Sequence, residues 1–87
     1  MRLLNNWKTI NDEVYQRLVV YELLDYEPEH PFGLKWFLES DMGEFVKSRA
    51  KEIEKIQTPN FTSLSLHLAV CCYMKPKDIT YLTLRYL

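Results

Sequence analysis

The feature that most constrains this chain is a long stretch without charge in its C-terminal part. No Asp, Glu, Lys or Arg occurs between Ile56 and Met74. In a chain of 87 residues of which 26% are charged, such a stretch is expected to be largely buried. Several Ser, Asn, Gln and His side chains interrupt it, so its apolar part is too short to cross a bilayer. We therefore expect residues 58–87 to supply much of the core of one small domain, 1–87.

The composition is typical of an ordered globular protein. Hydrophobic residues make up 47% of the chain, and only two glycines and four prolines occur, which argues against disorder. The only cysteines are the adjacent Cys71 and Cys72, so no disulfide framework is expected. The N-terminal sequence MRLLNNWK lacks the apolar run of a secretory signal. These features predict a cytoplasmic protein that does not bind membranes.

The first third of the chain shows apolar residues at helical spacing. They are Ile10, Val14, Leu18, Tyr21 and Leu24. Asn11 can cap a helix, and the acids that follow it would then lie in a first turn, where the helix dipole favours them. The pattern predicts a helix from about residue 10 to 25. Its second half, LVVYELL, is apolar nearly all round, which indicates either a central position in the core or a surface covered by a partner.

The middle of the chain contains a proline-rich loop followed by helix signals. The sequence DYEPEHP is expected to end the first helix, and FGLKWFLES then predicts a short helix that begins at Pro31. Asp41 and Glu44 make an acidic capping box. This pair predicts a charged surface helix that runs to about Gln57.

Two patterns compete in the last third of the chain. Phe61, Leu64, Leu68 and Cys71 follow a helical spacing, whereas Leu64, Leu66, Leu68 and Val70 alternate as in a strand. The sequences Thr-Pro and Lys-Pro-Lys-Asp are good helix openings, and no glycine is present for a tight hairpin turn. We therefore predict an all-α fold of four to five short helices. An α+β fold with a C-terminal β-hairpin at 61–87 is the alternative that the sequence leaves open.

The residues that could carry chemistry are few. His67 and Cys71 would share one face of a helix, but no second pair of metal ligands accompanies them and no CxxC or HxxxH spacing occurs. Apolar surroundings would also raise the pKa of a thiol and leave it unreactive. Both glycines are isolated, so no phosphate-binding loop is expected. The sequence predicts no enzyme activity, no cofactor and no metal site.

The aromatic content favours a protein-binding function. Aromatic residues make up 14% of the chain and include six tyrosines and two tryptophans, which are enriched at protein interfaces. We expect a partner protein to contact either the acidic region from Asp25 to Asp41 or the C-terminal Tyr and Leu face. The predicted contact residues are Tyr26, Glu27, Glu29, His30, Trp36, Tyr81, Leu84, Tyr86 and Leu87.

The hypothesis is thus an adaptor, assembly factor or inhibitor of a larger protein. Short chains without functional signatures are frequent among phage and mobile-element proteins, which makes such an origin plausible. Self-association through the C-terminal face is included in this hypothesis. Truncation after Tyr81 is expected to abolish that association and to leave most of the helical content intact.

Nucleic-acid binding is the alternative function. The basic residues that could contact phosphate are Lys47, Arg49, Lys51, Lys55, Lys75 and Lys77. The net charge is −1, and the last predicted helix offers only Arg85 as a base, whereas a recognition helix needs several polar side chains. The sequence therefore favours a protein partner over DNA or RNA.

Overall fold

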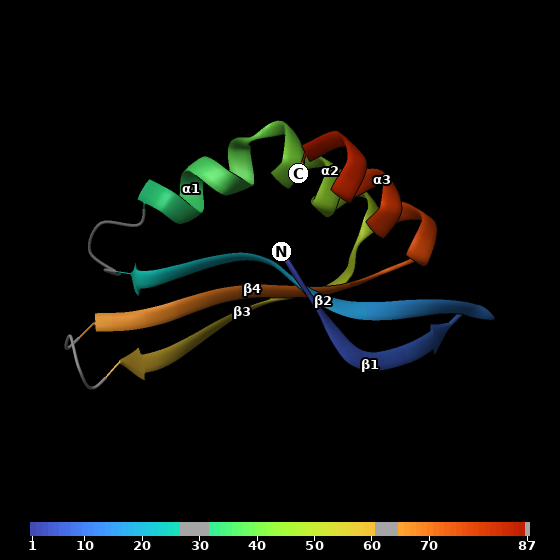
Figure 1. Cartoon of the computed structure of the whole chain (residues 1–87), viewed down its shortest axis with the longest axis horizontal. Coiled ribbons are helices and arrows are strands. Elements are labelled where there is room, and N and C mark those ends of the chain that lie inside the picture. The colour runs from blue at the N-terminus through green and yellow to red at the C-terminus, as the bar shows by residue number, and fades with distance from the viewer. Residues whose placement is uncertain (27–31, 61–64, 87) are drawn as a thin grey trace.

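The chain folds into one sheet and one layer of helices. The computed structural model describes residues 1–26, 32–60 and 65–86. The elements in these ranges are β1 (Arg2–Ile10), β2 (Glu13–Tyr26), α1 (Phe32–Glu39), α2 (Asp41–Arg49), β3 (Lys51–Asn60), β4 (Ser65–Met74) and α3 (Pro76–Tyr86). The four strands pair antiparallel in the order β1-β2-β4-β3. All three helices lie over the same face of the sheet (Figure 1).

The predicted all-α fold is wrong, and the first predicted helix shows why. Residues 10–25 lie in β1, a turn and β2. Leu18, Val19 and Val20 are all at most 3% exposed, so this part of β2 is buried on both of its faces. A strand buried on both faces reads as a continuous apolar run, because neither face needs polar side chains. The run LVVYELL is therefore a strand pattern that also satisfies helical spacing.

The turn between β1 and β2 uses the residues that were expected to begin a helix. Asn11 and Asp12 have positive φ angles of 52° and 65°. Asn and Asp tolerate this left-handed conformation better than other residues with a side chain. Two such residues form the turn whose twist matches a two-residue β-hairpin. The register Ile10↔Glu13 follows directly from it.

The charged helix predicted from Asp41 ends earlier than expected. α2 stops at Arg49, and Ala50 is already extended, with φ −82° and ψ 154°. The next ten residues form β3 at the edge of the sheet. Its composition favours a helix, but β4 is apolar and needs a strand on each side. Pairing between distant segments therefore outweighs local propensity here.

The charge-poor segment is the centre of the molecule because it contains β4. β4 lies between β2 and β3 and alternates its side chains between the two faces of the sheet. One set points to the helices and is at most 1% exposed: Leu68, Val70, Cys72 and Met74. Leu34 and Phe37 of α1, Val46 of α2, and Ile79 and Leu82 of α3 cover these residues. Burial of this segment is therefore achieved jointly by three short helices.

The last element is a helix, as the Lys-Pro-Lys-Asp opening indicates, so residues 79–86 do not form the second strand of a hairpin. Leu82 is fully buried and Leu84 is 81% exposed. Truncation after Tyr81 would therefore remove a core residue as well as an exposed one. The expectation that this truncation leaves the fold intact is corrected accordingly. None of the helices in the described ranges is long and apolar enough to cross a membrane.

Candidate functional site

The described surface has a groove beside β2, which we call the β2 groove. Its volume is about 770 Å³. Residues 19–22 of β2 and the start of the chain, Met1 and Arg2, line one side. The helices line the other side through Trp36, Phe37 and Met42, with Tyr86 from the end of α3. An apolar hollow with a few polar groups at its rim is the usual form of a binding site.

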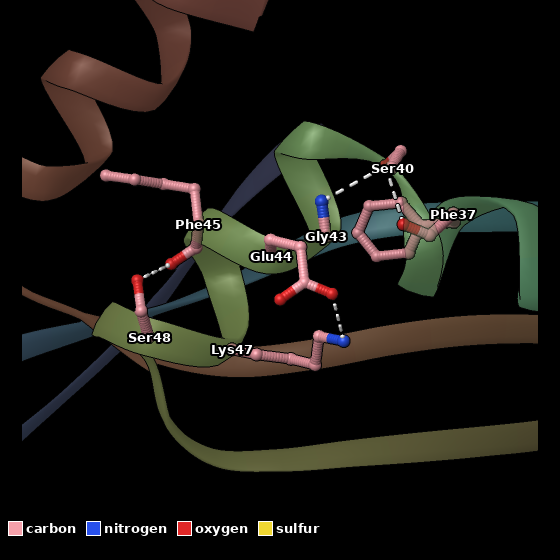
Figure 2. Close-up of polar contacts among 7 residues, drawn as sticks. All are labelled: Phe37, Ser40, Gly43, Glu44, Phe45, Lys47 and Ser48. Carbon is pink, nitrogen blue, oxygen red and sulfur yellow. Dashed lines mark hydrogen bonds and ion pairs between the residues drawn. The ribbon is translucent and has the colours of Figure 1, made fainter.

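The corner between α1 and α2 forms one wall of the groove. Ser40 lies at this corner, where its hydroxyl donates to the Phe37 carbonyl at 2.6 Å and accepts from the Gly43 amide at 3.1 Å (Figure 2). A Cβ atom on Gly43 would lie 2.0 Å from the Phe37 carbonyl oxygen, so only glycine fits at this position. Ser40, rather than the predicted Asp41, is therefore the cap of α2, and the close approach fixes Phe37 relative to α2.

Two residues predicted from the sequence to bind a partner meet at this groove. Trp36 lines it and is 69% exposed, and Tyr86 lines it from α3 and is partly buried. Tyr21 and Phe37 also line the groove, and their rings stack with their centroids 4.5 Å apart and 7° between their planes. A large exposed indole beside stacked aromatic rings is typical of an interface anchor.

The remaining predicted contact residues lie elsewhere or outside the described ranges. Tyr81 is half exposed and packs on Phe45 at 4.9 Å between ring centroids, and Leu84 projects from α3. Tyr26 is the last residue of β2. The other predicted contacts fall outside the described residues: Glu27, Glu29, His30 and Leu87. Of the predicted contact residues, the structure therefore brings only Trp36 and Tyr86 together at the β2 groove, within the residues that it describes.

One ion pair marks the rim of the groove. The Arg2 guanidinium donates two hydrogen bonds to Glu22 Oε1, and this lowers the pKa of the Glu22 carboxyl. Glu22 also raises the pKa of Arg2. The pair joins β1 to β2 just past the last register pair between them, Arg2↔Val19. Asp41, also at the rim, has no ion-pair partner among the described residues.

The predicted pairing of His67 with Cys71 on one helix face is wrong, because both residues lie on strand β4. Residues four apart on a strand share a face but lie roughly 13 Å apart along it. His67 Nε2 instead lies 3.5 Å from Glu22 Oε2. Burial raises the pKa of the neighbouring Cys72 thiol to about 12, so this thiol stays protonated.

The face of the sheet opposite the helices is covered by paired charges. The described ion pairs that lie across it, or at its end, are Arg2–Glu22, Lys8–Glu52, Arg17–Glu54 and Lys75–Glu13. Lys8 Nζ and Arg17 Cζ lie 5.7 and 5.9 Å from the centroid of the Tyr73 ring. Tyr15, Val19 and Cys71 are at most 5% exposed although they lie outside the core cluster under the helices. Long charged side chains can cover apolar groups in this way.

The basic residues considered for nucleic-acid binding do not form one strip. Lys47 and Arg49 end α2, whereas Lys51 and Lys55 lie on β3. Lys47 pairs with Glu44 at 2.8 Å, and Lys75 pairs with Glu13. The predicted helical strip 47–55 is therefore divided between two elements of different geometry.

Sequence reasoning missed the contribution of β2 and of the α1–α2 corner to the site. Val20 and Tyr21 are part of the groove, and so is Met42. The apolar run that contains residues 19–22 was recognised in the sequence, but it was predicted to be a helix. It is part of strand β2, and these residues line the groove. Comparisons of the chain with protein-family models, with curated protein sequences and with solved structures gave no match.

Proposed function

We propose that this chain is a non-enzymatic protein-binding module, acting as an adaptor, assembly factor or inhibitor, and that it holds its partner at the β2 groove. The observation that carries the proposal is Trp36, which is 69% exposed at the rim of an apolar hollow of about 770 Å³. Exposing so much of an indole to water is unfavourable unless a partner covers it. Anchor residues of interfaces are enriched in tryptophan and lie beside such hollows.

The chemistry of the described residues supports binding over catalysis. Among residues 1–26, 32–60 and 65–86, no three His, Cys, Asp or Glu side chains lie close enough to hold a metal ion together. Burial raises the pKa of the Cys72 thiol to about 12, so this thiol stays protonated and is a poor nucleophile. A nucleophile needs a base within hydrogen-bond reach, and the histidine nearest in sequence, His67, lies beside Glu22 instead.

The pairing of charges supports a protein partner over nucleic acid. Two of the six bases considered for phosphate contact, Lys47 and Lys75, each have a carboxylate partner, which largely neutralises their charge within the protein. Nucleic-acid binding depends on unpaired bases that can replace counterions along the phosphates. The groove itself is lined by both signs of charge, with Glu22 and Asp41 beside Arg2 and the start of the chain.

Site-specific photo-crosslinking in the source cells tests this proposal. A photoreactive phenylalanine analogue replaces Trp36 in one variant and the exposed Lys55 of β3 in the matched control. We expect a discrete protein adduct at position 36, identified by mass spectrometry, and none of the same mass at position 55. Adducts of equal yield at both positions, or no adduct at position 36, would contradict a partner site at the β2 groove.

A further inference from the structure

A second hollow lies between α2 and α3, which we call the α2–α3 hollow. Its volume is about 470 Å³, and it is lined by Phe45 and Arg49 of α2 and by Lys77, Asp78 and Tyr81 of α3. The two helices lie next to each other over the sheet (Figure 1), and the Phe45 and Tyr81 rings contact each other with their centroids 4.9 Å apart. None of the five lining residues also lines the β2 groove. The α2–α3 hollow is therefore a separate part of the surface.

The exposed face of α3 beside the hollow is apolar although it contains two threonines. Tyr81 is 50% exposed and Leu84 is 81% exposed, and residues three apart are neighbours on a helix surface. The hydroxyls of Thr80 and Thr83 donate to carbonyl oxygens four residues earlier, at 3.0 and 2.9 Å. Because both hydroxyl protons are used within the helix, these threonines offer a partner mainly their methyl groups. A partner that covers this face must therefore supply apolar side chains.

The exposed charges at the hollow are positive. Arg49 and Lys77 are both exposed, and neither has an ion-pair partner among the described residues. Lys77 attracts Glu13 electrostatically, but the Glu13 carboxylate is bonded to Lys75. The acid of the hollow, Asp78, is only 9% exposed and lies in the first turn of α3, where the helix dipole favours a carboxylate. The two bases and this acid leave a net charge of +1, with the positive groups nearest to solvent.

We propose that the α2–α3 hollow and the adjoining face of α3 bind an acidic amphipathic segment of another protein. The apolar side chains of the segment cover Tyr81 and Leu84, and removing these side chains from water stabilises the complex. Its Asp or Glu side chains lie against Arg49 and Lys77, and the forked guanidinium of Arg49 suits a carboxylate. Complementary charge of this kind selects the partner and speeds its association. The surface is separate from the β2 groove, so its occupant is independent of the partner proposed there.

An acidic protein segment fits this surface better than a second copy of the chain or a nucleic acid does. In a two-fold symmetric pair both copies present the same patch. The bases Arg49 and Lys77 of one copy would then meet the same bases of the other and no exposed acid. Nucleic-acid binding depends on many contacts between bases and phosphates, whereas here two bases border the apolar side chain of Leu84. A segment with both acidic and apolar side chains matches both parts of the surface.

A displayed library of random linear peptides, selected against the full chain, provides the probe. We expect enriched peptides that combine Asp or Glu with apolar residues, and synthetic versions should bind Leu84→Ala at least about tenfold more weakly. Arg49→Gln and Lys77→Gln should each weaken binding about threefold or more, and added salt should reduce this difference. Lys35→Gln is the matched control, because Lys35 is an exposed base of α1, at the other end of the helix layer (Figure 1). This control and Trp36→Ala should change the affinity by less than about twofold.

The outcomes separate this surface from the β2 groove. Peptides that lose affinity for Trp36→Ala but not for Leu84→Ala would place binding in the β2 groove and contradict the proposed α3 surface. Peptides that need Leu84 but lack acids, or that respond equally to Arg49→Gln and Lys35→Gln, would overturn the acidic occupant. Displacement of the peptide by a DNA or RNA oligonucleotide that binds more tightly would identify nucleic acid as the ligand instead.

A second copy is tested by the mass in solution. A doubled mass that Leu84→Ala returns to that of one chain would identify a second copy as the occupant and contradict a foreign segment. Failure to enrich any peptide that needs Leu84 would overturn the binding surface on α3. That result would leave the β2 groove standing, because crosslinking at Trp36 tests the groove separately.

Discussion

The edge strand β3 and the part of the inner strand β2 beyond Val19 differ in the chemistry of their side chains. On β3, every side chain in 51–59 is exposed, charged residues recur along the strand, and Pro59 removes a backbone donor. Glu52 adds an irregularity with a φ angle of 51°. On β2 beyond Val19, the edge is apolar and borders a groove. The charges and the proline of β3 disfavour pairing with another strand. β2 beyond Val19 lacks both lysine and proline and borders an apolar groove.

The difference teaches that exposure alone does not identify a binding surface. Every side chain in 51–59 of β3 is exposed, whereas most of β2 is buried or partly buried, yet the charges and the proline of β3 make pairing unfavourable. The edge of β2 is partly buried, but its neighbours Trp36 and Met42 supply apolar contacts for an incoming side chain. The chemistry next to the backbone therefore matters more than the exposed area.

The largest expected effect concerns the helix that covers the sheet between these edges. Leu82→Ala should lower the free energy of unfolding by about 3 kcal/mol, because Leu82 is fully buried and its loss leaves a cavity. Leu84→Ala, two residues away and 81% exposed, is the matched control and should change it by less than about 0.5 kcal/mol. Urea denaturation followed by circular dichroism measures both. Similar losses for the two variants would mean that α3 does not pack as described.

The next largest effect is expected at the corner that forms the wall of the β2 groove. Gly43→Ala should cost about 2 kcal/mol, because the new Cβ would meet the Phe37 carbonyl and the gain in helix propensity only partly compensates. Ser48→Ala on the exposed side of the same helix is the control and should have little effect. The same denaturation measurement applies. A stability unchanged by Gly43→Ala would show that the corner can relax without disturbing the groove.

Local signals explain which elements were predictable from the sequence. α3 follows a Lys-Pro-Lys-Asp opening, and the short helix after the proline-rich loop is present as α1, because caps and prolines act within a few residues. The strands depend on partners that are distant in the sequence. Leu18 pairs with Cys72, for example, and no local sequence pattern predicts this pairing. The same reason explains the error at 10–25, where helical spacing and a doubly buried strand coincide.

The candidate site was predictable only in part, for a related reason. Trp36 and Tyr86 were expected to contact a partner because exposed aromatic residues suit interfaces. Their meeting in one groove depends on α1 and α3 lying over the same face of the sheet (Figure 1). Residues 19–22 of β2 line the same groove. Their place there depends on the register with distant strands, which single residues do not reveal.

Exchanging the protective charge between the two edges tests the comparison directly. Lys55→Val removes a lysine from β3 beside the exposed Ile56, and it should raise self-association several-fold at high protein concentration. Leu24→Lys adds a lysine to β2 and should not raise self-association, while changing the unfolding free energy by less than about 0.5 kcal/mol. Sedimentation velocity over a concentration series measures both. Equal behaviour of the two variants would remove the proposed difference between the edges.

The smallest expected effect concerns the ion pair between Arg2 of β1 and Glu22 of β2. Arg2, by hydrogen bonding to Glu22, holds the carboxyl pKa below its ordinary value of 4.5. A carboxylate with a lowered pKa in the folded state stabilises the fold above about pH 4.5, and this contribution is lost as the pH falls through the lower, folded-state pKa. The pair is exposed to solvent, so the contribution is small and is reduced by salt.

Glu22→Gln isolates this contribution. The variant should be slightly less stable than the wild type at pH 7, and the difference in urea midpoint should shrink as the pH is lowered towards 3, because the wild-type carboxyl is then protonated. Glu44→Gln, which alters an exposed ion pair on α2 away from the β2 groove, is the control. A difference for Glu22→Gln that stays constant between pH 7 and 3 would mean that the side chain acts through packing and that its charge does not tie β1 to β2.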